Sequence, residues 1–170
     1  MRRLVVTMIL VCTLLPMVST AAYATPSTEV AGDLDYWFQV TGMREAGPNI
    51  FMDATEQETW REAEDMAGMA GYGNSVFTVG MFAAGFWNVW LRCEFEGVVD
   101  GKEGTLLIQM VGKKPLGEDW YGQWVILSGT GELANAHGRG TWWGPGYRDE
   151  VKDPDSPDCY YSGQIHFDPE

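Results

Sequence analysis

The segment VWLRCEFEGVVDGKEGT, residues 89–105, decides the fold of this chain. Apolar residues occupy every second position of its first half: Val89, Leu91, Cys93 and Phe95. A period of two residues is typical of a strand that buries one face. Asp100-Gly101 follows, and this pair readily supplies the positive φ that a tight turn needs. The segment therefore predicts a β-hairpin whose second strand begins near Thr105.

The same alternation recurs at both ends of the chain. It involves Tyr36, Phe38 and Val40 near the start and Cys159, Tyr161, Ile165 and Phe167 near the end. Further strands are predicted over residues 76–82, 105–111, 123–128 and 140–143, with turns at 113–117 and 144–146. Seven or more short strands predict one all-β domain, either a sandwich or a barrel. We favour a single antiparallel β-barrel because closure removes exposed strand edges.

One segment, residues 54–69, fits a helix instead. Thr55 is a candidate helix cap with Glu58 three residues further on. The segment is rich in acids: Glu56, Glu58, Glu62, Glu64 and Asp65. These acids are interpreted as the solvated surface of that helix rather than as a site.

Residues 1–24 have the three parts of a secretory signal peptide. Arg2-Arg3 is cationic, residues 4–18 are apolar, and Ala22-Tyr23-Ala24 is a cleavage signature. The apolar part is shorter than the roughly 20 residues that cross a bilayer, which disfavours the alternative of a membrane anchor. We therefore predict a signal peptide over residues 1–24, a single β-barrel domain over residues 25–170, and a secreted or periplasmic location.

The chain is strongly acidic. It has 170 residues, with 11 Lys and Arg against 24 Asp and Glu, for a net charge of −13. The predicted signal carries two Arg and no acids, so removing it leaves 9 − 24 = −15. A protein that binds a polyanion needs clustered basic residues. The acidic composition therefore disfavours nucleic acid and anionic membrane surfaces as partners. We expect a monomer or a weak oligomer with no membrane partner after cleavage.

Cysteine usage points to a disulfide in an exported protein. Of three cysteines, Cys93 and Cys159 lie beyond the predicted signal, and each falls on the apolar phase of its strand. Disulfides persist in oxidising compartments, so we predict a bond between these two residues. The alternative is two separate buried thiols.

A glycine-rich stretch, SGTGELANAHGRGT at residues 128–141, carries a resemblance to a known family. Together with Phe95-Glu96-Gly97 and DGKEGT at residues 100–105, it resembles the bacterial DUF3224 family, whose proteins are similar to the allene oxide cyclase and dirigent barrels. The resemblance implies an antiparallel calycin-like barrel of about eight strands. It implies no reaction, because that family has no assigned activity.

The glycines of this stretch are predicted to be structural. Gly129, Gly131, Gly138 and Gly140 would permit bulges and close strand approach at a barrel corner. A phosphate-binding loop would need a following helix, whereas residues 141–143 continue as a strand.

Metal and cofactor signals are weak. The two histidines, His137 and His166, have no ligand spacing to each other or to an acid, and the acids of residues 149–158 lack a calcium-loop pattern. No metal, cofactor or catalytic residue is therefore predicted.

Eight tryptophans are the compositional excess of the chain. One interpretation is that they fill the core and interfaces. The other, which we adopt, is that they serve binding of a small, largely apolar molecule in a barrel pocket, with Trp90, Trp124 and Glu94 as candidate ligand-binding residues. By phase, Trp124 is expected inside, while Trp37 and Trp90 are expected to be partly exposed.

Two alternatives remain open. One is a cyclase or isomerase that uses a carboxylate such as Glu94 or Glu132. The other is a surface protein that binds carbohydrate or a partner through Trp37 or Trp90.

Overall fold

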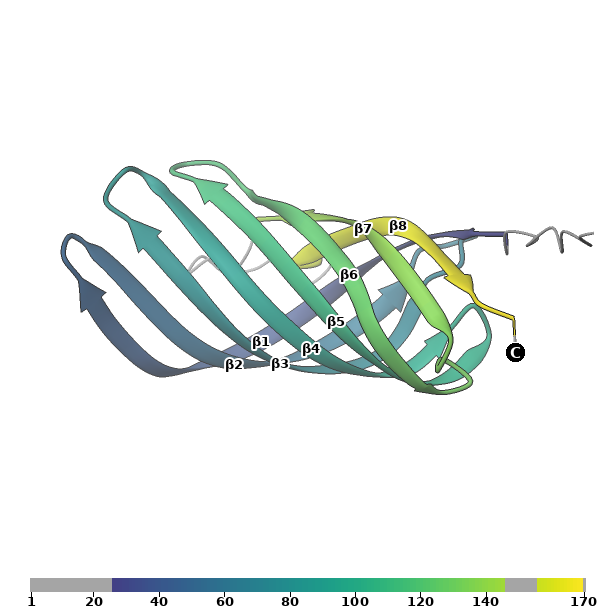
Figure 1. The fold of residues 1–170 in the computed structure, drawn as a ribbon. Coiled ribbons are helices and arrows are strands. Elements are labelled where there is room, and N and C mark those ends of the chain that lie inside the picture. The colour runs from purple at the N-terminus through teal and green to yellow at the C-terminus, as the bar shows by residue number, and fades with distance from the viewer. Residues whose placement is uncertain (1–25, 146–155, 170) are drawn as a thin grey trace, which may run out of the picture.

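The computed structural model describes residues 26–145 and 156–169, and these form a closed antiparallel β-barrel (Figure 1). Its strands are β1 (Thr28–Ala46), β2 (Asn49–Glu62), β3 (Met69–Phe82), β4 (Phe86–Val99), β5 (Lys102–Pro115), β6 (Trp120–Gly131), β7 (Ala136–Gly144) and β8 (Cys159–Phe167). Each strand pairs with the next in sequence, and β8 closes the ring on β1. The predicted all-β, eight-stranded barrel is confirmed.

The two ends of the barrel differ. The β1–β2, β3–β4 and β5–β6 hairpins gather at one end, which we call the hairpin end (Figure 1). Residues 26–28 and the last residues of β8 lie at the other end. The predicted signal peptide lies outside the described residues. Within those residues, no helix has the length and hydrophobicity to cross a membrane.

The predicted hairpin at Asp100-Gly101 is confirmed. These residues have φ values of 51° and 75° and join β4 to β5. The two strands pair along their whole length, from Val99 opposite Lys102 at the turn to Phe86 opposite Pro115 at the far end. Positive φ at both central residues matches the right-handed twist of paired strands, so the turn extends the ladder without splaying it.

The helix predicted over residues 54–69 is wrong. Residues 54–62 belong to β2, where Ala54, Glu56, Glu58 and Trp60 are buried and the residues between them are exposed. On a helix, side chains two residues apart point in different directions, whereas on a strand they share one face. The strand therefore places Glu56 and Glu58 together inside the barrel rather than on a solvated surface.

The predicted disulfide is also wrong, because Cys93 and Cys159 are free and buried thiols. Cys93 lies on β4 between Ser75 and Ile108, while Cys159 lies on β8 beside Leu34. In a ring of eight strands, β4 and β8 occupy opposite walls. The apolar phase of each cysteine correctly indicated an inward side chain, but phase does not say which wall that side chain faces.

Large buried side chains occupy the barrel interior in the half away from the hairpin end, which we call the filled half. Four large aromatic side chains occupy this filled half: Trp60, Phe95, Trp124 and Tyr161. The Trp60 ring lies 6.0 Å from Phe95 and 5.1 Å from Tyr161, centroid to centroid. The Trp124 indole donates to the Ser162 carbonyl at 3.1 Å. Aromatic contacts of this kind supply much of the burial energy of a small barrel.

Glycines make room for these rings. A Cβ on Gly140 would overlap both the Ser162 carbonyl oxygen and the Trp124 indole, and one on Gly163 would overlap the same indole. Gly131, in the β6–β7 turn, has a φ of 64°, which favours glycine. A Cβ on Gly129 would overlap the Leu133 carbonyl, and one on Gly138 would crowd Ile165. Close packing explains Gly129, Gly138 and Gly140 of the glycine-rich stretch, and positive φ explains Gly131.

Candidate functional site

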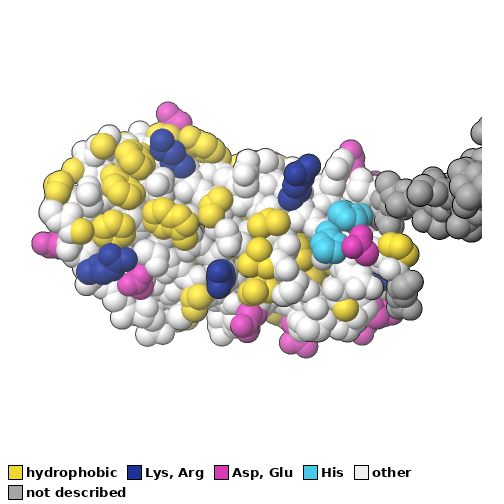
Figure 2. All heavy atoms as spheres, viewed as in Figure 1, with side chains coloured by type: hydrophobic (Ala, Val, Ile, Leu, Met, Phe, Trp, Pro, Cys, Tyr) yellow, Lys and Arg dark blue, Asp and Glu magenta, His cyan; other side chains and the backbone are white. Residues whose placement is uncertain are grey.

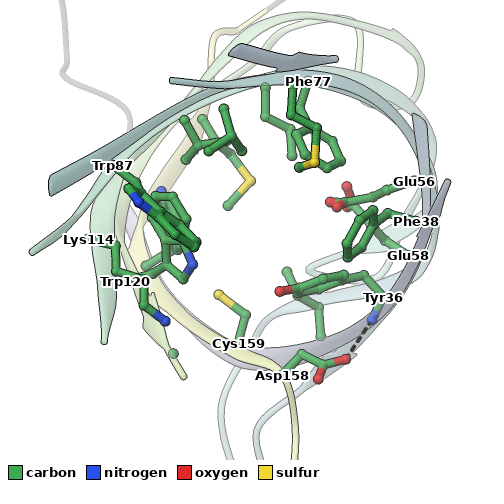
Figure 3. A pocket seen from close by; sticks show the side chains of 18 of the residues that line it. Tyr36, Phe38, Glu56, Glu58, Phe77, Trp87, Lys114, Trp120, Asp158 and Cys159 are labelled. Atoms are coloured by element: carbon green, nitrogen blue, oxygen red, sulfur yellow. Dashed lines mark hydrogen bonds between the residues drawn. The ribbon is translucent and has the colours of Figure 1, made fainter. Parts of the chain in front are cut away.

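A cavity of about 330 Å³ occupies the open half of the barrel, next to the hairpin end (Figure 3). Its wall is mostly apolar and includes Leu34, Phe38, Met52, Phe77, Val79 and Met110. Small-molecule sites typically measure about 300–1,000 Å³ and combine an apolar lining with a few polar groups. The cavity has the size and the lining of a site for a small ligand.

Three indoles form one side of this cavity, and we call them the aromatic wall. Trp87 and Trp120 have ring centroids 6.3 Å apart, and Trp120 stacks on Trp142 at the same distance with 30° between the planes. The Trp142 indole donates to the Val111 carbonyl at 3.1 Å, which fixes its orientation. The wall offers a broad apolar surface to a ligand.

Two buried carboxyl groups on β2, Glu56 and Glu58, lie across the cavity from Trp87 and Trp120, and we call them the carboxyl pair (Figure 3). Glu58 is only 3% exposed. It accepts hydrogen bonds from the Trp60 indole at 2.5 Å, from the Ser75 hydroxyl and from the Cys93 thiol at 3.2 Å. These donors occupy three of the roughly four acceptor positions of a carboxylate, which donates none itself.

The second member of the pair, Glu56, extends its carboxyl group into the cavity (Figure 3). Burial raises the pKa of Glu56 well above the ordinary value of 4.5, and the nearby Glu58 charge and a hydrogen bond to Glu58 raise it further. Asp158 adds a smaller effect of the same sign on this pKa. Glu56 therefore keeps its proton to a higher pH than an ordinary carboxyl group. A buried carboxyl with a perturbed pKa in a cavity is typical of functional sites.

Other polar groups lie at the edge of the cavity. Asp158 accepts a hydrogen bond from the Tyr36 backbone N–H at 3.0 Å, and the Lys114 ammonium donates to the Pro145 carbonyl at 3.2 Å. The Cys159 thiol donates to the Trp143 carbonyl at 3.4 Å. Burial raises the pKa of the Cys159 thiol, so the reactive thiolate form is disfavoured.

The residues proposed from sequence for ligand binding do not line this cavity. Trp90 is 45% exposed on the outer face of β4, and Glu94 is exposed on the same face. Trp124 is buried in the filled half, as its phase predicted. The predicted exposure of Trp37 and Trp90 is confirmed. Glu132 lies in the β6–β7 turn, where it accepts from the Glu103 backbone N–H at 3.0 Å.

Sequence reasoning missed the carboxyl pair. The signal that would have found it is the alternation of Ala54, Glu56, Glu58 and Trp60, which continues the inward phase of Met52. A strand prediction for these residues would have placed both carboxyl groups inside.

The two histidines lie together at the end of the barrel opposite the hairpin end, outside the cavity (Figure 2). Their rings stack across β7 and β8 with centroids 5.3 Å apart. The Nε2 atoms of His137 and His166 lie 3.2 and 3.7 Å from the two carboxylate oxygens of Asp168. In the part of the chain that the structure describes, no group of three or more His, Cys, Asp or Glu residues is arranged to hold a metal ion.

Fold and site together define a class: an eight-stranded antiparallel barrel with one filled half and one cavity that holds a buried carboxyl pair. The chain is similar to the crystal structure of a protein of unknown function from the DUF3224 family of Shewanella oneidensis MR-1. The TM-score is 0.66 at 15% sequence identity, over 85% of this chain and 100% of the other. The resemblance to the DUF3224 family is confirmed at the level of the fold.

Two other comparisons found no relative. No protein-family model matches the sequence, and no curated protein matches it. The similarity to allene oxide cyclase and dirigent barrels stays a prediction.

Proposed function

We propose that this protein is an exported binding protein that holds a small, largely apolar molecule in the barrel cavity. The observation that carries the proposal is the apolar cavity of about 330 Å³ beside a fully packed half of the same barrel. An unfilled apolar cavity lowers stability in proportion to its volume, and the filled half demonstrates that these strands can pack without one. A cavity kept at that cost is best explained by a ligand.

The arrangement of the lining gives such a ligand an orientation. Its apolar body would pack on the aromatic wall, where Trp120 stacks on Trp142. Its polar group would reach the carboxyl pair, because few other polar side chains line the cavity. Entry would be from the hairpin end, where Trp87 and Lys114 lie on the strands that flank the hairpins.

A titration with 4-phenylbutan-1-ol, a neutral apolar probe, tests the proposal. Quenching or enhancement of tryptophan fluorescence and the heat of binding are measured on the wild type, on Trp120→Ala and on Trp90→Ala. Removing Trp120 deletes part of the aromatic wall and should weaken binding about ten-fold, whereas Trp90 lies on the outer face and its removal should change binding less than two-fold. Absence of binding, or equal losses in both variants, would contradict the proposal.

A second candidate function, an acid–base enzyme of the cyclase or isomerase kind, is favoured by one observation. Glu56 holds its proton above the ordinary carboxyl pKa in an apolar cavity, as a general acid must. In this role Glu56 would donate a proton to an unsaturated substrate and take one back from the cation that forms, and the charge of the neighbouring Glu58 would keep Glu56 protonated beforehand. Turnover that is lost in Glu56→Gln and kept in Glu94→Gln would support it, and turnover that survives Glu56→Gln would refute it.

The predicted context of the protein forms part of the proposal. Export follows from the signal peptide proposed over residues 1–24, and a monomer or weak oligomer follows from a surface that carries strong net negative charge. Immunodetection of the protein in the periplasmic and culture fractions, together with sedimentation of the purified chain, tests both points.

A further inference from the structure

We propose that the ligand of this cavity carries a protonated amine that binds at Glu56 and Glu58, with its apolar body against the aromatic wall. This inference rests on the binding function proposed above and names the chemical class of the ligand. Three features of the cavity support it: its charge, the hydrogen bonds of the carboxyl pair, and the rings beside the pair.

Acidic groups outnumber basic groups in the lining of the cavity. Three carboxyl groups line one small cavity, those of Glu56, Glu58 and Asp158, and Lys114 is the cationic side chain among its lining residues. Lys114 donates to the Pro145 carbonyl and lies on the other side of the cavity from Glu56 (Figure 3). An apolar environment strongly disfavours several like charges, and an anionic ligand would add another. The charge of the lining therefore favours a cation.

The two members of the carboxyl pair differ in their hydrogen bonds to the protein. Both oxygens of Glu58 already accept donors from the protein, namely Trp60, Ser75 and Cys93. Glu56 lies next to Glu58 on the same buried face of β2, and the interaction with Glu58 raises the pKa of Glu56. Its carboxyl group still faces the cavity (Figure 3). A ligand ammonium group has three donors, and it can replace the Glu56 proton while bonding to both carboxylates.

Aromatic rings lie on the same side of the cavity as the carboxyl pair (Figure 3). Phe38 packs edge-on to Phe77 with centroids 5.8 Å apart, and Tyr36 lies 6.5 Å from Phe38. These three residues line the cavity, and Figure 3 shows Phe38 and Tyr36 on the same side as Glu56. The faces of aromatic rings attract cations, most strongly where water is excluded. Rings next to buried carboxylates form the kind of pocket that recognises an alkylammonium group.

This arrangement makes a measurable link between binding and protons. The groups that face Glu56 across the cavity or beside it are Glu58 on its own strand, Tyr36 on β1, Cys93 on β4, Lys114 on β5, Asp158 before β8 and Cys159 on β8. Glu56 is the member of this set whose proton the ammonium group replaces. Binding of an amine should therefore release about one proton at a pH where Glu56 is protonated.

The experiment compares three probes with one apolar body: 4-phenylbutylamine, 4-phenylbutan-1-ol and 4-phenylbutanoate. Calorimetric titration in two buffers of different ionisation enthalpy gives both affinity and the number of protons released. We expect the amine to bind about ten-fold or more tightly than the alcohol, the carboxylate to bind weakest, and only the amine to release a proton.

Matched variants complete the test. Glu56→Gln keeps a donor to Glu58 but has no proton to release, so the amine should lose its advantage over the alcohol and its proton release. Glu94→Gln makes the same substitution on the outer face of β4 and should leave both intact. If Glu56→Gln fails to fold, proton release by the wild type decides the matter alone.

The outcomes separate the two proposals. Equal affinity for alcohol and amine, or amine binding without proton release, would overturn the amine inference and leave the binding function standing. Absence of binding by all three probes would overturn the binding function itself.

Discussion

The filled half and the open half of the barrel are built from the same strands but differ in what their inward positions hold. In the filled half, glycines such as Gly140 lie opposite large rings such as Trp124, and the two fit together. In the open half, glycines also make room for one ring, because a Cβ on Gly112 or Gly122 would overlap the Trp142 indole, but Trp120 and Glu56 remain separated by a cavity (Figure 3).

The difference teaches where stability and binding are located. Close packing of Trp60, Phe95, Trp124 and Tyr161 provides the hydrophobic core that holds the ring closed. The open half contributes less to stability and contains the buried carboxyl pair, which costs free energy to desolvate. Mutations in the two halves should therefore affect different properties of the protein.

The largest expected effect comes from truncating one tryptophan in each half. Trp124→Ala removes a side chain that is 1% exposed and should lower the free energy of unfolding by about 3–5 kcal/mol. Trp120→Ala enlarges an existing cavity and should cost only about 1 kcal/mol, because a half-buried side chain loses part of its transfer free energy. Urea denaturation followed by circular dichroism measures both. Equal losses of unfolding free energy in the two variants would contradict the proposed difference in stability between the halves.

A smaller effect is expected from pH, and it belongs to the open half alone. The pKa of Glu56 is higher in the folded protein than the 4.5 of an exposed carboxyl, so the folded state binds more protons above pH 4.5. Stability must then fall as pH rises from 4.5 towards the folded pKa, by about 1.4 kcal/mol per pH unit inside that window.

Denaturation of the wild type and of Glu56→Gln at several pH values isolates this contribution. Other carboxyl groups titrate equally in both proteins, so the wild type should lose stability relative to the variant as pH rises. Glu94→Gln, on the exposed outer face, should run parallel to the wild type. If the free energy of unfolding of the wild type instead rose relative to that of Glu56→Gln with increasing pH, Glu56 would not be buried in its protonated form.

The smallest effect is expected from the cysteines, and it sharpens the comparison between the halves. Cys93 contacts Glu58 beneath the cavity, whereas Cys159 lines the cavity itself. Burial raises the pKa of both thiols, so N-ethylmaleimide should react slowly with the folded protein and reach Cys159 before Cys93. Peptide mapping measures the order of modification. A reductant should leave the unfolding midpoint unchanged, and a downward shift would restore the disulfide hypothesis.

The architecture could be predicted because it depends on local signals. Alternation along residues 89–96 identifies an inward face, and Asp100-Gly101 fixes the register of one hairpin. The remaining strands follow the same period of two, and closure follows from the need to remove strand edges. The registers that decide which side chains meet across the barrel depend on all eight strands together, so they were not predictable from any one of them.

The site was harder to predict because its residues contradict the usual rule of burial. Acidic residues are rarely buried, so the acids of residues 54–69 indicated a solvated helix. The buried carboxyl group of Glu58 is stabilised in part by hydrogen bonds from Ser75 and Cys93, which lie on two other strands. Such compensation is visible only once the strands are assembled. The disulfide hypothesis failed for the same reason. The alternation of a strand shows that a cysteine points inward, but it does not show on which wall of the barrel that strand lies.

The hydrogen bond from Trp60 to Glu58 gives the molecule a built-in spectroscopic reporter. The indole proton of Trp60 points at an oxygen 2.5 Å from its nitrogen, so its NMR resonance should lie far downfield of the other indole protons. Any change of charge in the carboxyl pair would alter the electron density of that oxygen and displace the resonance. With isotope labelling, the resonance of the buried Trp60 indole would thus report both ligand binding and loss of a proton from the carboxyl pair in a single spectrum.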